Sequence, residues 1–476
     1  MTPRRRLLVL LICCSSLLMV SMDNTIVNVA LPSIRRELGA SLSGLQWTVD
    51  AYTLVLAGLL VLAGSTADRL GRRRVFQAGL IIFTLGSLLC SLAPGLGWLV
   101  AARVMQAVGG SMLNPVAMSI ITNVFTDPGE RARAIGVWGA VVGLSMGLGP
   151  IVGGLLTEEV SWRAIFWINV PIGLVACVLA AIFVPESRAA RPRRPDPVGQ
   201  LLVAATLTAL TYGIIEGPRH GWASPEIIGL FAAAAVALTT LLVHESRHAE
   251  PLLELRFFRS IPFSSATVTA VAAFAAFGAF LFLNTLYLQD TRGLSPIQAG
   301  LCTLPMAVAT FVLAPISGHL VATRGVRLPL CVAGVCMAVA AALLTDLSAT
   351  TPLPQILLAY LLFGVGFGLV NSPITNTAVS GMPRQQAGVA AAVASTSRQV
   401  GTTLGVAVSG SIAGTGPSGP GFATATHPVW WLIVGCGVLI TALGGVATTR
   451  AAEDSARSVA HLFAEDLPAV ELARAR

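Results

Sequence analysis

Three charged residues lie inside apolar stretches of the sequence: Asp23, Asp50 and Arg103. Charge is costly in a hydrophobic segment, so such residues mark proton paths, ion sites or ligand sites by default. At about 1.5 Å of rise per residue, all three lie roughly 9–12 Å from the outer ends of their expected helices. A carboxylate near an arginine can gain and lose a proton as its exposure changes, and it can attract a cation. We therefore expect them to couple proton movement to movement of another molecule.

Each of these charges has an alternative interpretation. Asp23 is our first choice as proton carrier or coupling acid, and Asp50 is the second. Asp50 could instead be a hydrated acid near the outer mouth, and Arg103 could bond backbone carbonyls. Glu216, which precedes Gly217 and Pro218, could attract cations or simply lie at the membrane interface.

Other polar and aromatic residues could line a central cavity. Five amide side chains within or at the ends of apolar segments could line this cavity or form hydrogen bonds between helices. These residues are Asn24, Asn114, Asn284, Gln289 and Asn371. An adaptable hydrophobic site could use Trp47, Phe277, Phe280, Phe282 and Tyr287, although Trp47 and Tyr287 also suit interfacial aromatic belts. Asp290 is expected to pair locally with Arg292.

The elements that must position these residues are membrane-spanning helices. The chain has 476 residues, of which 55% are hydrophobic and 11% charged, and its mean hydropathy is +0.79. This composition predicts an all-α, polytopic integral membrane protein. About 14 segments approach the ~20 residues that a bilayer requires, and the expected ranges are 7–30, 44–65, 75–93, 97–121, 135–157, 163–184, 198–216, 225–243, 261–288, 297–321, 328–345, 354–378, 386–412 and 427–448.

The arginines predict the orientation. The net charge is +8, and most arginines outside the spans fall in the N-terminus and in alternate loops. The positive-inside rule accounts for this pattern and places both termini in the cytoplasm. We therefore expect a multi-pass membrane protein whose partner is the lipid bilayer, and we expect no nucleic acid partner.

Several function classes are excluded. The chain has no lysine, so the lysine-containing phosphate-binding loop of ATP-driven pumps is impossible. We find no Ser/His/Asp set, and we expect no metal site, no cofactor and no enzymatic activity. The eight cysteines all fall in apolar segments, which predicts buried thiols. His244 and His248 are expected to be solvated.

A weak internal repeat predicts two related halves. The loop at 64–74 has an echo at 318–328, Asn114 has one at Asn371, and Gly143 and Gly147 have counterparts at Gly401 and Gly405. Transporters are commonly built this way, with the substrate site between the repeats. We expect bundles at residues 1–185 and 261–448, an inserted helix pair with cytoplasmic linkers at 186–260, and a cytoplasmic tail at 449–476.

Two motifs suggest moving parts. The loop GSTADRLGRRR, 64–74, places Asp68 beside Arg69 and just ahead of Gly71 and Arg72. Asp68 could latch the cytoplasmic face, or the arginines could simply hold the loop inside. The stretch GLSMGLGPIVGG predicts a close helix contact and hinge through its small residues and proline, which are Gly143, Gly147, Gly149, Pro150, Gly153 and Gly154.

The loop that begins at Gly64 resembles the signature loop of the major facilitator superfamily. Further stretches resemble its 14-helix drug:proton antiporters, including actinobacterial antibiotic exporters, and they are MDNTIVNVALPSI, LQWTVDAYTL, RVMQAVGGSMLNP, the 143–154 motif, WRAIFWINVPIG and LYLQDTRGLSPIQAG. The resemblance implies two six-helix bundles plus two inserted helices, and a cytoplasmic gate at Gly64, Asp68, Arg69, Gly71 and Arg72. One departure is Ala322, which stands in the second loop copy where an acid is expected.

Together with the charged residues, the resemblance implies a monomeric, proton-driven exporter of hydrophobic or cationic small molecules, such as drugs and antibiotics, in the bacterial cytoplasmic membrane. Export would proceed by alternating access, without a cofactor. Two alternatives stay open: a proton-coupled importer of a metabolite and a non-transporting membrane sensor.

Overall fold

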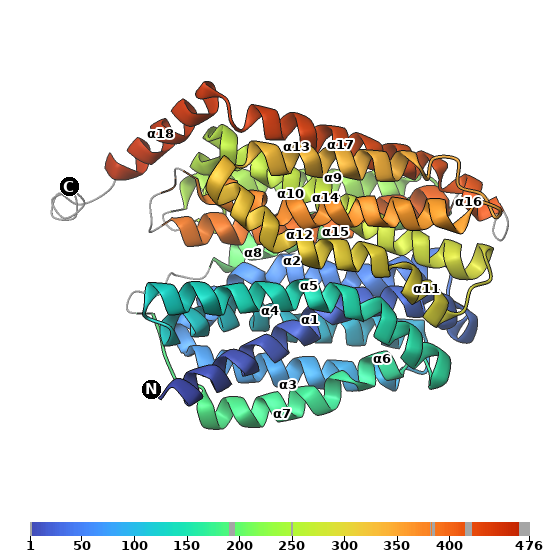
Figure 1. The fold of residues 1–476 in the computed structure, drawn as a ribbon, viewed down its shortest axis with the longest axis horizontal. Coiled ribbons are helices and arrows are strands. Elements are labelled where there is room, and N and C mark those ends of the chain that lie inside the picture. Colours follow the sequence, from blue (N-terminus) through green and yellow to red (C-terminus); the bar gives the residue numbers. More distant parts are fainter. Residues whose placement is uncertain are drawn as a thin grey trace.

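The computed structural model describes residues 2–189, 196–248, 251–380, 382, 386–414 and 421–465. Residues 190–195 of the expected linker and 466–476 of the expected tail lie outside this range. Within it the chain is almost entirely helical, and long helices run side by side (Figure 1).

The first half of the chain forms a bundle of long helices. Its members are α1 (Pro3–Leu38), α2 (Leu42–Leu70), α3 (Arg72–Ser91), α4 (Leu96–Val124), α5 (Pro128–Glu159), the short α6 (Ala164–Trp167) and α7 (Asn169–Phe183). A pair of helices follows, α8 (Pro197–His220) and α9 (Pro225–Arg247), and a 3₁₀ turn, η1 (Leu255–Arg259), leads onward.

The second half repeats the arrangement. Its members are α10 (Ile261–Leu286), the π-helical η2 (Tyr287–Thr291), α11 (Pro296–Cys302), α12 (Leu304–Arg324), α13 (Arg327–Ala342), α14 (Leu353–Val379), α15 (Ala387–Ala413), α16 (Phe422–Ala425) and α17 (His427–Val446). A final helix, α18 (Arg450–Glu465), projects beyond this bundle (Figure 1).

The structure confirms an all-helical membrane protein. In the described part of the chain, 12 helices, some joined from two pieces, are long and apolar enough to cross a membrane. Two other helices fall in the remaining expected segments: α13, with 16 residues, and α15, with 27. The count of 14 spans therefore stays a prediction.

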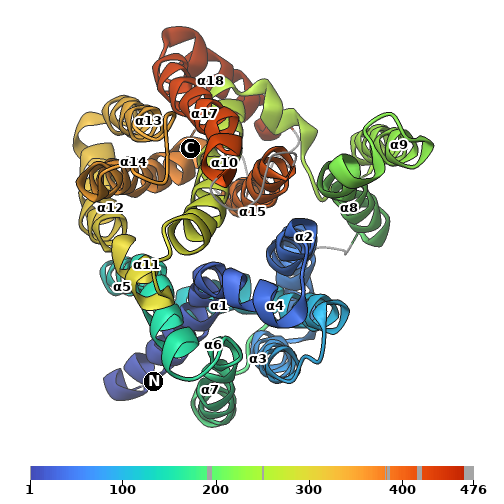
Figure 2. The same cartoon turned by 90° about the vertical axis from the view of Figure 1, so that its right-hand side faces the viewer.

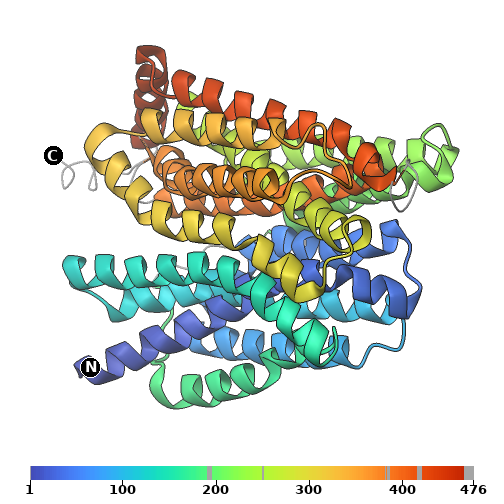
Figure 3. The ribbon, with the colours of Figure 1, turned by 45° about the vertical axis from the view of Figure 1, so that its right-hand side comes forward.

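Two bundles face each other, and the inserted pair lies beside both. The blue-to-teal first half and the yellow-to-red second half form separate layers in Figure 1. Seen end-on, α8 and α9 lie to one side, where α8 contacts α2 of one bundle and α15 of the other (Figure 2). The N-terminus and the last described helix lie at the same end of the molecule (Figures 1 and 3).

Local sequence explains where helices begin and why prolines are tolerated inside them. Ser41 caps α2 by accepting the Gly44 N–H at 3.1 Å, and Ser295 and Gln298 form a capping box at the start of α11. Pro115 and Pro150 lie within α4 and α5. A spanning segment in lipid has no alternative to the helix, and its neighbours can satisfy the backbone groups that a proline frees.

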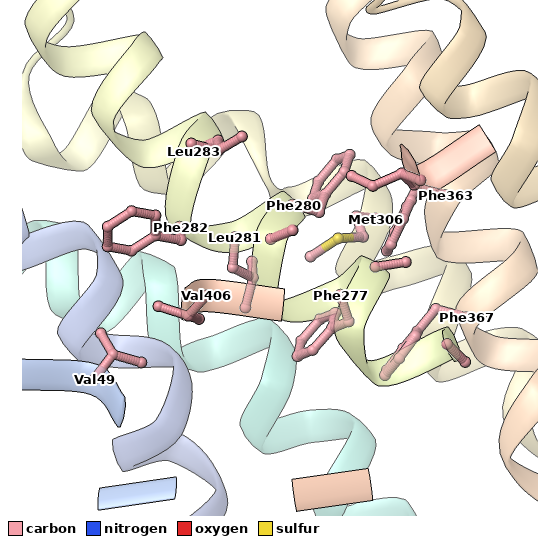
Figure 4. Close-up of a cluster of buried hydrophobic side chains, with 14 of the residues drawn as sticks. Val49, Phe277, Phe280, Leu281, Phe282, Leu283, Met306, Phe363, Phe367 and Val406 are labelled. Carbon is pink, nitrogen blue, oxygen red and sulfur yellow. The ribbon is translucent and has the colours of Figure 1, made fainter. Parts of the chain in front are cut away.

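An aromatic cluster fills the core of the second half. Phe277 of α10 stacks on Phe367 of α14 with ring centroids 4.3 Å apart, and Phe280 stacks on Phe363 at 4.1 Å. In Figure 4 these rings surround Met306, with Val406 close to the cluster. The rings stabilise the contact between α10 and α14 because they bury apolar area and because their stacked geometry is favourable.

The glycines of α5 allow two close contacts on different sides. A Cβ atom at Gly153 would lie 2.7 Å from Cγ1 and 2.9 Å from the carbonyl oxygen of Ile26 in α1. At Gly154 a Cβ would lie 2.5 Å from the carbonyl oxygen of Pro296 in α11, in the other half. The 143–154 motif thus packs against both its own bundle and the second one, while its action as a hinge stays a prediction.

We predict that Gly153→Val destabilises the protein by about 1–3 kcal/mol, because the backbone of Ile26 cannot move aside without disturbing α1. Gly139→Val is the matched control, since no atom lies within 4 Å of a Cβ at Gly139 of the same helix. Thermal unfolding in detergent, followed by tryptophan fluorescence, measures the difference. Equal melting temperatures for the two variants would contradict the packing described above.

Candidate functional site

Asp23 is the acceptor at the centre of a buried polar network in the first bundle. It lies in α1 and is fully buried. Its Oδ2 accepts a hydrogen bond from Nη1 of Arg103 in α4. Its Oδ1 accepts from Nε2 of Gln106 at 2.8 Å and from Nδ2 of Asn169 in α7 at 3.2 Å. The carboxylate is thus surrounded by donors on both oxygens.

Arg103 extends this network to two further helices. Its Nε donates to the Thr48 carbonyl of α2 at 3.1 Å, and its guanidinium lies 4.2 Å above the Tyr52 ring. Gln106 in turn donates to the Ser87 hydroxyl of α3 at 2.7 Å. One ion pair therefore links α1, α2, α3, α4 and α7. A buried pair of charges is tolerable only with such additional hydrogen bonds.

Asp23 and Arg103 stand out in the sequence as charges in apolar segments, whereas Ser87, Gln106 and Asn169 of the same network were not predicted. A signal was available for Gln106, which follows Arg103 by three residues and so shares its helix face. Ser87 and Asn169 are single polar residues on other helices, and nothing in the sequence links them to Asp23.

Asp50 lies outside this network, at the interface between the halves. Successive helical residues are rotated by about 100°, so Asp50 points away from Thr48 and Tyr52, which contact Arg103. Its neighbours on the same face contact α15: Gln46 Nε2 donates to the Ala407 carbonyl at 2.8 Å, and Thr403 Oγ1 donates to Thr53 Oγ1 at 2.8 Å. Asp50 is fully buried, and its Oδ2 has no hydrogen-bond partner.

Glu216 faces α2 from the inserted pair. One of its oxygens accepts from the Trp47 indole N–H at 3.0 Å, and the other is buried without a partner. Trp47 also packs against Tyr212, with ring centroids 5.6 Å apart. Glu216 is therefore a buried acid at a helix contact and not an exposed residue at the membrane surface.

The five amides occupy different environments. Gln289 donates to the Val29 carbonyl at 2.8 Å and so joins the two halves. Asn284 donates to the Phe280 carbonyl at 2.8 Å, and the side-chain oxygens of Asn284 and Asn114 are buried without partners. Asn24 and Asn371 are half-buried.

The polar contacts at the end of the molecule opposite the N-terminus join the two halves. The Arg35 guanidinium lies 3.5 Å from the Asp290 carboxylate, and the Ile297 N–H donates to Glu158 at 3.0 Å. The local Asp290–Arg292 pair that we expected is wrong, because Arg292 instead donates to the Thr351 carbonyl. The π-helical turn of η2 orients Asp290 and Gln289 toward the other half.

The predicted cytoplasmic gate is held within the first half. Asp68 accepts from Arg72 Nε at 3.0 Å and Nη2 at 2.8 Å. Gly71 has φ +116° and a Cβ there would lie 2.6 Å from the Glu186 carboxylate, so both its conformation and its space favour glycine. Arg69 is exposed, and Gly64 lies near Pro115 of α4. A latch between halves stays a prediction.

An apolar cavity of about 230 Å³ lies where the two halves meet the inserted pair. Its walls come from α2, α8, α9, α10 and α15, and they include Gly58, Leu207, Leu241, Val271 and Val400. The sequence analysis named none of these residues, because apolar residues in spans carry no individual signal. The cavity can hold the apolar part of a small molecule.

Of the two histidines at the end of α9, only one is solvated as expected. His244 is half-buried and its Nε2 lies 3.0 Å from both oxygens of Asp196, while His248 is exposed and stacks on His244. The three side chains present donor atoms close enough to hold a metal ion. Asp196 also accepts the Gly199 N–H at 2.9 Å as the cap of α8, so capping and ion pairing account for the arrangement.

Paired helical bundles with a buried charge network and a polar interface define a membrane transporter of the repeat-built class. The family model for the Major Facilitator Superfamily matches residues 13–406, and the chain belongs to that family.

Similar proteins agree with this assignment. The chain is 38% identical over 396 residues to the multidrug resistance protein Stp of Mycobacterium tuberculosis, covering 83% of this chain and 74% of that protein. It is 37% identical over 395 residues to a tetracenomycin C resistance and export protein of Streptomyces glaucescens, covering 83% and 73%. The fold is similar to a bacterial Spinster homologue in an inward-facing, occupied conformation, with a TM-score of 0.64, 15% identity and coverage of 94% and 98%.

We predict that Asp23→Asn and Arg103→Gln each destabilise the protein by about 3–5 kcal/mol, since each leaves one buried charge unpaired. The double variant should lose clearly less free energy of unfolding than the sum of the losses in the two single variants. Unfolding by denaturant in detergent measures all three variants.

The half-exposed Arg163–Glu37 pair, with side chains 31% and 48% exposed, supplies the matched control. Breaking it should cost about 1 kcal/mol or less. Additive losses for Asp23 and Arg103 would show that the two charges do not depend on each other.

Proposed function

We propose that this chain exports hydrophobic small molecules, including cationic ones, across the bacterial cytoplasmic membrane in exchange for protons. Relatives at 37–38% identity are named for multidrug resistance or for antibiotic resistance and export. The observation that carries proton coupling is Asp50, a buried carboxyl group with one oxygen unpartnered, set between α2 and the opposite half.

The hydrogen bonds favour Asp50 over Asp23 as the proton carrier. All the partners of Asp23 are donors, and a proton added to that carboxylate would displace one of them. At Asp50, Oδ2 has room for a proton without loss of a bond. Its place between Gln46 and Thr53, which contact α15, means that any separation of α2 from α15 changes the exposure of the acid.

Export would proceed by alternating access. The contacts that join Arg35 to Asp290, Gln289 to Val29 and Glu158 to Ile297 support closure of the outer side. Substrate would then enter from the cytoplasm or the inner leaflet. In the proposed cycle these contacts break when the outer side opens, and Asp68 takes part in closing the cytoplasmic side.

The remaining features follow the same proposal. The protein crosses the membrane 14 times with both termini in the cytoplasm, acts as a monomer, and uses the proton gradient in place of any cofactor. Glu216, which accepts a hydrogen bond from Trp47 of α2, would attract cationic substrates at the inserted pair.

Everted membrane vesicles with an acidified interior test the proposal. Ethidium and other lipophilic cations are added, and a pH-sensitive dye follows the interior. We predict a substrate-dependent rise in interior pH for the wild type, and a loss of about tenfold or more in Asp50→Asn, which cannot carry the proton. Asp346→Asn, which changes an exposed loop acid, is the control and should respond like the wild type.

Other outcomes have definite meanings. A response that survives Asp50→Asn and is lost in a folded Asp23→Asn would move the proton site to Asp23. No response to any compound, with folded protein in the membrane, would contradict export.

A further inference from the structure

Arg398 is a second arginine within an apolar helix, and no acidic residue of the described part of the chain pairs with it. It lies 11 residues from the start of α15 at Ala387, which places it roughly 16 Å along the helix. Its Nη2 donates to Thr375 Oγ1 at 2.5 Å and lies 3.5 Å from the Asn371 carbonyl, both in α14. Its Nε is buried and has no hydrogen-bond partner.

The comparison with Arg103 shows what is missing. Both side chains contact helix carbonyls and lie near an aromatic ring, Tyr52 for Arg103 and Phe274, at 5.9 Å, for Arg398. Arg103 is neutralised by Asp23. Among the described residues, every hydrogen-bond partner of Arg398 is a neutral oxygen, and no carboxylate forms an ion pair with it. Its positive charge is therefore uncompensated.

Arg398 lies where α15, α10 and α14 of the second half meet. Its side chain reaches from α15 across Phe274 of α10 to α14. Helix α14 packs against α10, α12, α13 and α15 of its own bundle. Thr375 and Asn376, beside the guanidinium on α14, are nevertheless exposed. These exposed polar side chains lie in the last turn of α14, which ends at Val379. Polar groups at the end of a span suit contact with water, which indicates a hydrated surface beside Arg398.

We propose that Arg398, with Thr375 and Asn371, forms a subsite for the anionic group of a transported molecule, such as a carboxylate or sulfonate on an apolar ring system. This inference rests on the proposed export function and extends its substrates to amphipathic acids. The unpartnered Nε and the Nη atoms present a fork that matches two anionic oxygens. The apolar part of the molecule would lie against the half-buried Phe274 ring beside the guanidinium.

A matched pair of dyes tests the subsite. 1-Anilinonaphthalene-8-sulfonate and N-phenyl-1-naphthylamine share one ring system and differ by the sulfonate, and ethidium serves as a cationic probe. Export of each is measured with full-length protein in vesicles. We expect the wild type to export all three, and Arg398→Gln to lower export of the sulfonate relative to the neutral dye by about tenfold or more.

Two variants control for the change. Arg398→Lys keeps the charge but loses the fork, so it should restore part of the sulfonate export. Arg457→Gln removes an exposed arginine of α18 and should leave the ratio of the two dyes unchanged. Since the ratio is taken within each variant, a general loss of folded protein cancels from it.

The outcomes separate this inference from the function on which it rests. If the wild type exports ethidium and the neutral dye but does not export the sulfonate, the subsite is overturned and the proposed export function is still supported. An unchanged dye ratio in Arg398→Gln would also overturn it. Failure of the wild type to export any of the probes or any compound of a wider panel would contradict the proposed function itself.

Discussion

The buried pair of Asp23 and Arg103 is the interaction on which the first bundle depends. Two charges removed from water are costly unless each remaining donor and acceptor is satisfied. Here Gln106, Asn169 and the Thr48 carbonyl provide those bonds, and they come from three different helices. The helices cannot separate without exposing an unpaired charge. The pair therefore makes the bundle a rigid unit, which a transporter built from two moving bodies needs.

Charge is distributed unequally between the two halves. In the first, the arginine of the span is matched by an acid, while the unmatched acid, Asp50, faces the interface. In the second, no acid among the described residues matches Arg398. An internal repeat would by itself place similar groups in similar positions. In the proposed cycle the first half would hold the proton chemistry, and the second half would contribute one fixed positive charge beside its aromatic cluster.

The sequence predicted the helical membrane fold, because that fold follows from composition, and it drew attention to Asp23 and Arg103 because each is a charge in an apolar segment. It did not separate Asp50 from the Asp23–Arg103 pair, although rotation about α2 places it on the opposite face from Thr48 and Tyr52. Ser87 and Asn169 could not be found, since their contact with Asp23 depends on which helices are neighbours. The error at Asp290 has the same origin: Arg292 is close in sequence, but the turn of η2 directs Asp290 to Arg35 of the other half.

The contacts that close one end of the interface suit a proposed rocking motion. They consist of one partly exposed ion pair and a few hydrogen bonds to backbone groups, such as those from Gln46 and Gln289. Each contact contributes on the order of 1 kcal/mol, so the whole set stabilises the closed end by only a few kcal/mol. A proton or a ligand that binds one conformation more tightly than the other by a few kcal/mol is enough to shift the equilibrium between the closed and open conformations. The strong buried ion pair lies inside a bundle and the weak contacts lie between bundles, so opening would break the contacts that are easiest to replace.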